Sequence, residues 1–201
     1  MNNFFPVPEG NTDLVSTDLA ADLVEVGSAV DTTGVQYLKF TKIGTWVFGP
    51  EDDQLGADEV LAVNPASFTI GWAGWEDGKP QDGQTLPIGQ RSELMPESEL
   101  PALKPGKKNG WMRELGVQFR TIEDGITMSY HTGSYSGKQA VTKLMKEIGL
   151  GLQAHPEAPV ALVKLSGDSY KHKEHGDIQT PEITVIGWAD ADGKEVKKLA
   201  A

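Results

Sequence analysis

Residues 111–131, WMRELGVQFRTIEDGITMSYH, contain the pattern that decides the fold class. Two strand-like runs, Trp111–Arg120 and Ile126–His131, flank the turn sequence EDG at 123–125. Runs of this kind separated by a short Asp-Gly turn predict an antiparallel hairpin. We therefore expect the core of this chain to be built on β-sheet.

One helical segment follows the hairpin. Ser136 is the expected N-cap, and His155-Pro156 is expected to end the helix. Between these positions, apolar residues recur at spacings of three and four and form a single stripe: Ala140, Val141, Leu144, Met145, Ile148 and Leu152. This stripe predicts an amphipathic helix that packs against the sheet.

Further strands are expected on both sides of this unit. Residues 35–48 have the pattern of a hairpin with Gly44 in its turn, and EVLAVN and SFTIGWAGW follow it. Val160–Leu165 and Glu182–Trp188 are the last two expected strands. Trp72 and Trp75 are three residues apart, so one is expected in the core and the other near the surface. Six residues are expected to share one core: Phe40, Val63, Phe119, Leu144, Leu162 and Ile186.

This order of elements predicts a mainly β fold with one embedded helix, of the α+β class. An elaborated OB-like Greek-key barrel fits it, and a two-sheet β-sandwich is the alternative. Residues 1–33 are interpreted as an acidic N-terminal arm with a short helix, and residues 34–201 as a single β-rich domain. Within that domain, residues 76–110 hold five prolines and no sustained periodicity, which predicts a long loop that serves as a lid or an assembly arm.

The amino-acid composition limits the cellular location and the kinds of site that we expect. The chain has no cysteine, no recognisable signal peptide and no apolar run that approaches the roughly 18 residues of a membrane span. Disulfides and thiolate metal sites are thereby excluded. We expect a protein that works inside a cell, with no membrane partner.

The net charge of −11 is unevenly distributed. Residues 1–101 carry 4 Lys and Arg against 17 Asp and Glu, whereas residues 102–175 carry 11 against 7. A net negative charge on the protein disfavours nucleic-acid binding, but a local basic face can still bind phosphate. The basic excess of the central segment therefore draws attention to residues 102–175.

Within that segment, residues 164–176, KLSGDSYKHKEHG, leave an expected strand, cross an expected turn at Gly167 and then place a tyrosine among cations. Single-stranded nucleic acid needs this combination, because an aromatic ring stacks on a base while positive charge meets phosphate. A solvated loop whose tyrosine packs on the core is the alternative interpretation. On the nucleic-acid interpretation, phosphates contact five lysines and bases stack on either of two tyrosines: Lys138, Lys143, Lys164, Lys171, Lys173, Tyr135 and Tyr170.

The candidate motifs for catalysis and metal binding do not match the residue patterns that such sites need. The sequence GSYSGK at 133–138 has three residues between its glycines where a phosphate-binding loop needs four, and Gln139 stands where Ser or Thr would bind magnesium. His131, His172 and His175 have no thiolate neighbours and no helical spacing that would bring their rings together on zinc. We expect no enzymatic activity, no cofactor and no bound metal.

Two segments carry a resemblance to a group of known proteins: LAVNPASFTIGWAGW at 61–75 and KLSGDSYKHKEHGDIQTPEITVIGW at 164–188. Together they resemble uncharacterised proteins of tailed bacteriophages, over roughly Tyr37–Trp188. The arrangement is similar to that of phage single-stranded DNA-binding proteins, although the C-terminal GKEVKKLAA is basic where many of those proteins end in an acidic tail.

The resemblance implies a non-enzymatic single-stranded DNA-binding protein, an accessory of phage replication or recombination in the cytoplasm of the infected bacterial host. The alternative is a virion structural protein, either a capsid decoration or a tail component. Either role is compatible with a homo-oligomer formed through the N-terminal arm or the 76–110 loop.

Overall fold

A curled, mixed β-sheet dominates the computed structural model, which describes residues 34–81, 83–104, 110–174, 176–190 and 195–198. The predicted acidic arm, residues 1–33, lies outside the described residues. The strands are β1 (Val35–Phe40), β2 (Trp46–Phe48), β3 (Asp53–Gln54), β4 (Leu61–Val63), β5 (Thr69–Glu76), β6 (Lys79–Gln81), β7 (Thr85–Pro87), β8 (Gly110–Thr121), β9 (Thr127–Thr132), β10 (Val160–His172), β11 (Gly176–Ala189) and β12 (Glu195–Lys198).

The strand order in the sheet is β12-β11-β10-β4-β8-β9-β1-β2-β3, and β5 pairs with β6, β7 and β8 beside this path. β1 runs parallel to β9, while all the other pairs are antiparallel. The two predicted hairpins are confirmed. Gly44 (φ +83°) turns β1 into β2, and Gly125 (φ +68°) lies in the turn between β8 and β9. Both positions need the left-handed conformation that glycine adopts at low cost.

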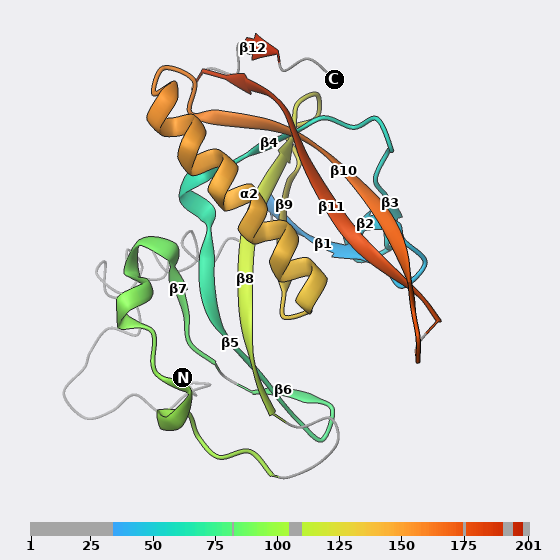
Figure 1. Cartoon of the computed structure of the whole chain (residues 1–201), viewed down its shortest axis with the longest axis vertical. Helices are drawn as coiled ribbons and strands as arrows, with labels where there is room; N and C mark the ends of the chain where they lie inside the picture. The colour runs from blue at the N-terminus through green and yellow to red at the C-terminus, as the bar shows by residue number, and fades with distance from the viewer. Residues whose placement is uncertain (1–33, 82, 105–109, 175, 191–194, 199–201) are drawn as a thin grey trace, which may run out of the picture. The chain divides into compact units, whose positions relative to one another are not determined.

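The helix α2 (Tyr135–Ala154) lies across one face of this sheet (Figure 1). Its N-cap is Ser134, whose hydroxyl accepts from the Gly137 amide at 3.1 Å, so the prediction of Ser136 as the cap was wrong by two residues. The predicted stripe is confirmed. Val141, Leu144 and Ile148 are buried in the core, and the other three members of the stripe pack against it half-buried.

The expected core is confirmed only in part. Val63, Phe119 and Leu144 are fully buried and Phe40 packs against them, but Leu162 and Ile186 are half-exposed and lie outside the core. In β10 the inward residues are Ala161, Val163 and Leu165. Lys164 shares the face of Leu162, so an alternation that buried Leu162 would have buried that cation too.

Ile186 leaves the core for a different reason. The pairing of β10 with β11 shifts between Leu162, which faces Gly187, and Val163, which faces Val185. Ile186 is therefore the extra residue of a β-bulge, and a bulge reverses which side of the strand faces inward. A period-two pattern read from the sequence does not reveal such an insertion.

The last two strands are longer than predicted. Residues 164–176 were expected to be a polar run beyond a turn at Gly167, but β10 continues to His172 and stays paired with β11 as far as Gly176. Gly167 is a strand residue opposite Pro181, and a Cβ at Gly167 would meet the Gly44 carbonyl oxygen at 2.7 Å. The position is glycine because another backbone passes close to it.

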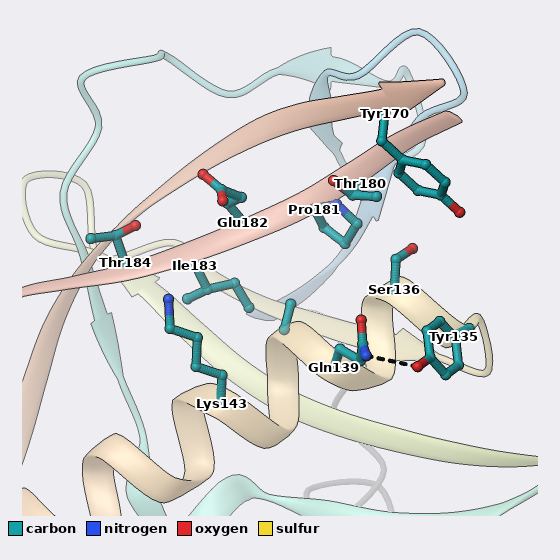
Figure 2. A pocket seen from close by; sticks show the side chains of 11 residues that line it. Tyr135, Ser136, Gln139, Lys143, Tyr170, Thr180, Pro181, Glu182, Ile183 and Thr184 are labelled. Carbon is teal, nitrogen blue, oxygen red and sulfur yellow. Dashed lines mark hydrogen bonds between the residues drawn. The ribbon is translucent and has the colours of Figure 1, made fainter. Parts of the chain in front are cut away.

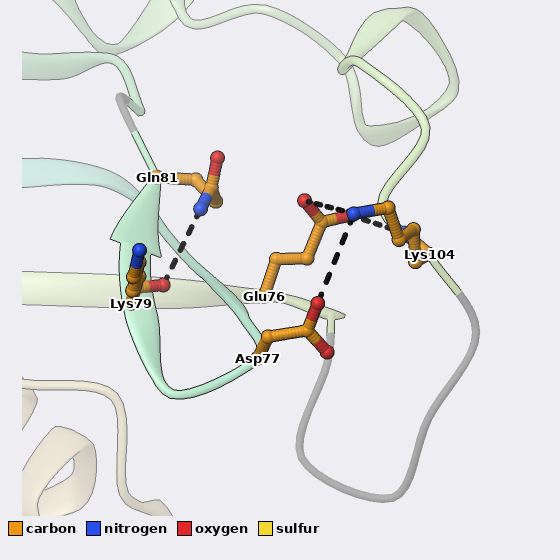
Figure 3. Close-up of polar contacts among 5 residues, drawn as sticks. All are labelled: Glu76, Asp77, Lys79, Gln81 and Lys104. Atoms are coloured by element: carbon orange, nitrogen blue, oxygen red, sulfur yellow. Dashed lines mark hydrogen bonds and ion pairs between the residues drawn. The ribbon is translucent and has the colours of Figure 1, made fainter.

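The segment predicted as one long loop is tied to the sheet. It contains β6, β7 and the short 3-10 helices Ile88–Glu93 and Glu97–Glu99. Two indole N–H groups hold it, since Trp72 donates to the Met95 carbonyl and Trp111 to the Pro101 carbonyl, each at 2.8 Å. Near its end, the Lys104 amide donates to Glu76 at 2.7 Å and the Lys104 ammonium lies 3.8 Å from both Glu76 and Asp77 (Figure 3).

The described chain is thus mainly β with one long α-helix, as predicted. Trp72 is buried and Trp75 is 41% exposed, so the expected division between these two tryptophans is confirmed. No helix in the described ranges combines the length and apolar character that a membrane crossing requires.

Candidate functional site

A groove of about 420 Å³ lies between the first half of α2 and strand β11 (Figure 2). The helix contributes one wall, and the β10–β11 hairpin contributes the other. The lining residues are Tyr135, Ser136, Gln139, Ala140, Lys143, Tyr170, Thr180, Pro181, Glu182, Ile183 and Thr184.

Five consecutive residues of β11, Thr180–Thr184, line this groove. Successive side chains of a strand point to opposite faces, so a cavity over one face would be lined by alternate residues only. Lining by every residue in turn indicates that the groove runs along the edge of the strand. We therefore expect main-chain groups of this strand, as well as side chains, to face the groove.

Two tyrosines from distant parts of the sequence meet at this groove. Tyr135 begins α2 and is 76% exposed, while Tyr170 lies on β10 and is 50% exposed. Gln139, one helical turn after Tyr135, donates from Nε2 to the Tyr135 hydroxyl at 2.9 Å. Tyrosine is enriched at interfaces, because it combines a large apolar ring with a polar hydroxyl, so two exposed tyrosines at one groove favour contact with a partner.

The two walls of the groove also carry charged residues, of which Lys143 faces the groove and Glu182 points away from the helix (Figure 2). Lys143 is exposed on the helix wall, and its side chain extends toward β11 beside Ile183 and Thr184 (Figure 2). Glu182 belongs to the strand wall, and its Oε2 lies 3.5 Å from the Ser166 hydroxyl. Ala140 and the buried Ile183 and Pro181 give the groove an apolar part.

The structure brings three of the seven predicted site residues to the groove: Tyr135, Lys143 and Tyr170. Lys138 precedes Lys143 by five residues, a rotation of roughly 140° around the helix axis, and it does not line the groove. Lys164 is on the opposite face of β10 from the core, where its ammonium donates to Asp58 at 2.9 Å. This contact lowers the pKa of the Asp58 carboxyl, through the hydrogen bond first and the charge of Lys164 second.

The other two lysines lie at the end of the hairpin. Lys171 is opposite Asp177 in the strand register, and Lys173 is in the turn that follows β10. Both are exposed. Lys171 directly follows Tyr170 on β10, so its side chain points to the other face of the strand, and Lys173 lies beyond the end of the strand.

Two of the three histidines considered as zinc ligands belong to separate local contacts. His131 on β9 lies between the Ser129 hydroxyl at 2.9 Å and Glu114 at 3.6 Å, and His172 accepts from the Glu174 amide at 3.1 Å. His175 is outside the described residues. Among the residues that the structure describes, no group of three metal-ligating side chains is found.

Sequence reasoning missed the strand side of the groove. Thr180, Pro181 and Glu182 are far from Tyr135 in the chain, and only the packing of α2 on the sheet brings them together. A proline inside a strand pattern was the one available signal, because it marks an open strand edge. Comparison with protein-family models, curated proteins and solved structures finds no match to this chain, so its geometry carries the functional argument.

Proposed function

We propose that this protein binds single-stranded DNA in the groove between α2 and β11, without catalysing a reaction on it. The observation that carries the proposal is the meeting of Tyr135 and Tyr170, both exposed, at one groove with Lys143. Base–aromatic stacking contributes about 1–3 kcal/mol per base and tolerates any sequence. Each ring offers a face to one base, and Lys143, about two helical turns further along α2, offers a charge to a phosphate nearer the other end of the groove (Figure 2).

The lysines at the hairpin end extend this site. Lys171 and Lys173 are exposed and follow Tyr170 directly in the chain. A DNA strand whose base stacks on Tyr170 would reach them by crossing the hairpin end, because the Lys171 side chain points to the other face of β10. The proposed role is accessory to phage replication or recombination, in the cytoplasm of the infected bacterium.

The architecture supports this proposal through the curl of the sheet. We propose that the sheet is an elaborated version of the OB-like Greek-key barrel, a fold that binds oligonucleotides. The turn between β1 and β2 approaches β10 at Gly44 and Gly167, so strands at distant places in the sheet order come into contact. Contact of this kind is what a partly closed barrel requires.

Fluorescence polarisation of a labelled oligothymidine at low salt tests the proposal. We expect Tyr170→Ala to weaken binding roughly ten-fold or more, because one stacked base is lost. Tyr37→Ala is the matched control, since Tyr37 is 57% exposed on β1 and does not line the groove. Duplex DNA should bind less well than single strands, because paired bases stack on one another.

Two outcomes would overturn the proposal. One is the absence of binding at tens of micromolar protein, and the other is equal loss of affinity in the Tyr170 and Tyr37 variants. Circular dichroism of both variants checks that each substitution leaves the fold intact.

A virion structural role is the second candidate, and a different surface favours it. Trp75 on β5 and Met112 on β8 are 41% and 47% exposed, and Pro80 of β6 is opposite Trp75. In the register of β5 and β8, Trp75 and Met112 are diagonal neighbours on one face. An exposed apolar cluster of this kind suits protein–protein contact. Detection of the protein in purified particles, and its loss from them after Trp75→Ser, would support this role.

A further inference from the structure

In the part of the chain that the structure describes, strand β11 has an open edge beside the groove. On one side it pairs with β10 over its whole length, from Gly176 to Ala189. On the other side, within the described ranges, β12 pairs with residues 187–189 alone. An open edge presents N–H and C=O groups that no neighbouring strand pairs, and residues Thr180–Thr184 of this edge line the groove.

Pro181 indicates which main-chain groups face the opening. Proline is tolerated in a strand where its missing N–H would point away from the neighbouring strand. The main-chain groups of alternate residues point to the same side of an antiparallel strand. The Pro181 carbonyl and the Ile183 amide are therefore expected to face the groove as an adjacent acceptor and donor.

We propose that the Watson–Crick edge of a bound base forms hydrogen bonds with this pair, the Pro181 carbonyl and the Ile183 N–H. The proposal rests on the proposed function and deepens it. Every unpaired base has a donor next to an acceptor on that edge, for example N3–H and O4 of thymine. Recognition through the main chain would thus accept all four bases and still require that the base be unpaired.

The same residue disfavours an added peptide strand as the occupant. A β-strand that joins an open edge needs a regular series of donors and acceptors, and Pro181 removes one donor from that series. A base needs one acceptor and one donor only. The exposed rings of Tyr135 and Tyr170 on the same groove provide stacking faces that a base uses.

A chemically modified oligonucleotide tests this with the protein unaltered. Oligothymidine is compared with the same oligomer built from N3-methylthymidine, which lacks the N3–H donor. We expect the methylated oligomer to bind about 2- to 10-fold more weakly per contacted base, as the loss of one net hydrogen bond predicts. An oligomer of 5-ethyldeoxyuridine is the control, because its added carbon lies away from the Watson–Crick edge, and it should bind like oligothymidine.

Amide chemical shifts give a second readout. Addition of oligothymidine should move the ¹H–¹⁵N signal of Ile183, and the methylated oligomer should move it less. Equal affinity for the two oligomers would overturn the inference and leave the proposed function standing, whereas failure of both to bind would remove the proposed function itself. An Ile183 signal that moves with protein concentration in the absence of DNA would show pairing with a second copy of the chain, and would also overturn the inference.

Discussion

The indole nitrogen of Trp46 donates a hydrogen bond of 2.8 Å to the carbonyl oxygen of Ser166, 120 residues further along the chain. Trp46 belongs to β2 and Ser166 to β10, two strands that have four other strands between them in the sheet order. The bond therefore spans the opening of the curled sheet. Trp46 is itself buried and packs against the rings of Phe40 and Tyr130, with centroid distances of 5.2 and 4.9 Å.

Trp46→Phe is expected to lower the free energy of unfolding by about 1–3 kcal/mol, because it removes the donor to a partly buried carbonyl while keeping an aromatic ring. Urea denaturation followed by circular dichroism measures the change. Trp75→Phe is the matched control, since Trp75 is exposed and should shift stability by only about 0.5 kcal/mol or less. Equal effects of the two substitutions would contradict a closing role for Trp46.

Alanine substitutions at three leucines should distinguish core positions from surface positions by their effect on the free energy of unfolding. Leu144→Ala should cost about 2–5 kcal/mol of unfolding free energy, because Leu144 is fully buried and its loss leaves a cavity. Leu162→Ala should cost less, since Leu162 lies half-exposed on the outer face of β10. Leu150→Ala, on the exposed side of the same helix, should be near neutral. A loss for Leu162→Ala as large as for Leu144→Ala would show that the outer face is covered in solution.

The elements themselves could be predicted from local patterns, and the departures have identifiable causes. The β8–β9 hairpin and the α2 stripe follow from turn residues and periodicity, both of which are local. Ile186 could not be assigned, because a bulge changes the face of a strand without leaving a compositional mark. The extension of β10 through Ser166–His172 was missed because its pairing partner, rather than its own polar residues, holds it in the sheet.

The residues of the candidate site could likewise be predicted only in part from the sequence. Tyr135, Lys143 and Tyr170 could be chosen by residue type, and the packing of α2 against β11 brings them to one groove. Lys164 has the same residue type as Lys143 but is paired with Asp58 on another face. Residue type predicts which chemistry is available, whereas the register of β10 and the phase of the helix decide which side chains reach the groove.

Replacing either of two glycines of α2 with alanine should change the stability of the protein, and the two changes should have opposite signs. A Cβ at Gly149 would meet no atom within 4 Å, so Gly149→Ala should stabilise the protein by roughly 0.5–1 kcal/mol through helix propensity. A Cβ at Gly151 would lie 2.0 Å from the buried ring of Trp188, so Gly151→Ala should destabilise it. Thermal unfolding of the two variants in parallel gives the sign of each change. Stabilisation by both would mean that Trp188 can move aside at little cost.

Tyr130 predicts a pH dependence of stability. Burial raises the pKa of the Tyr130 hydroxyl, with a smaller opposing effect from a hydrogen bond with Thr132. Below the ordinary tyrosine pKa of about 10, the residue is neutral in the folded and the unfolded chain, so its contribution is fully present. Above that pH the unfolded chain loses its proton first, and stability falls by up to about 1.4 kcal/mol per pH unit until the folded pKa is reached.

Tyr130→Phe should therefore flatten the fall in unfolding free energy between pH 9 and 11, a window set to bracket the ordinary pKa of about 10. Tyr37→Phe is the control and should retain the wild-type slope, because Tyr37 is 57% exposed. Denaturant titrations at several pH values supply the measurement. Identical slopes for the wild type and both variants would show that Tyr130 titrates in the folded protein as it does in the unfolded one.

On the proposed function, the lysines at the hairpin end predict how the affinity for single-stranded DNA responds to salt. Lys171 and Lys173 are exposed, and each phosphate they contact should release a counterion on binding. Replacing both with alanine should weaken binding for every sequence tested and reduce the slope of log affinity against log salt by about 1.4, at roughly 0.7 per phosphate of a single strand. Lys79 and Arg91, both exposed and away from the groove, form a control pair that removes the same charge. An equal change of slope in the control pair would mean that the overall charge of the protein, rather than contacts at the hairpin end, sets the salt dependence.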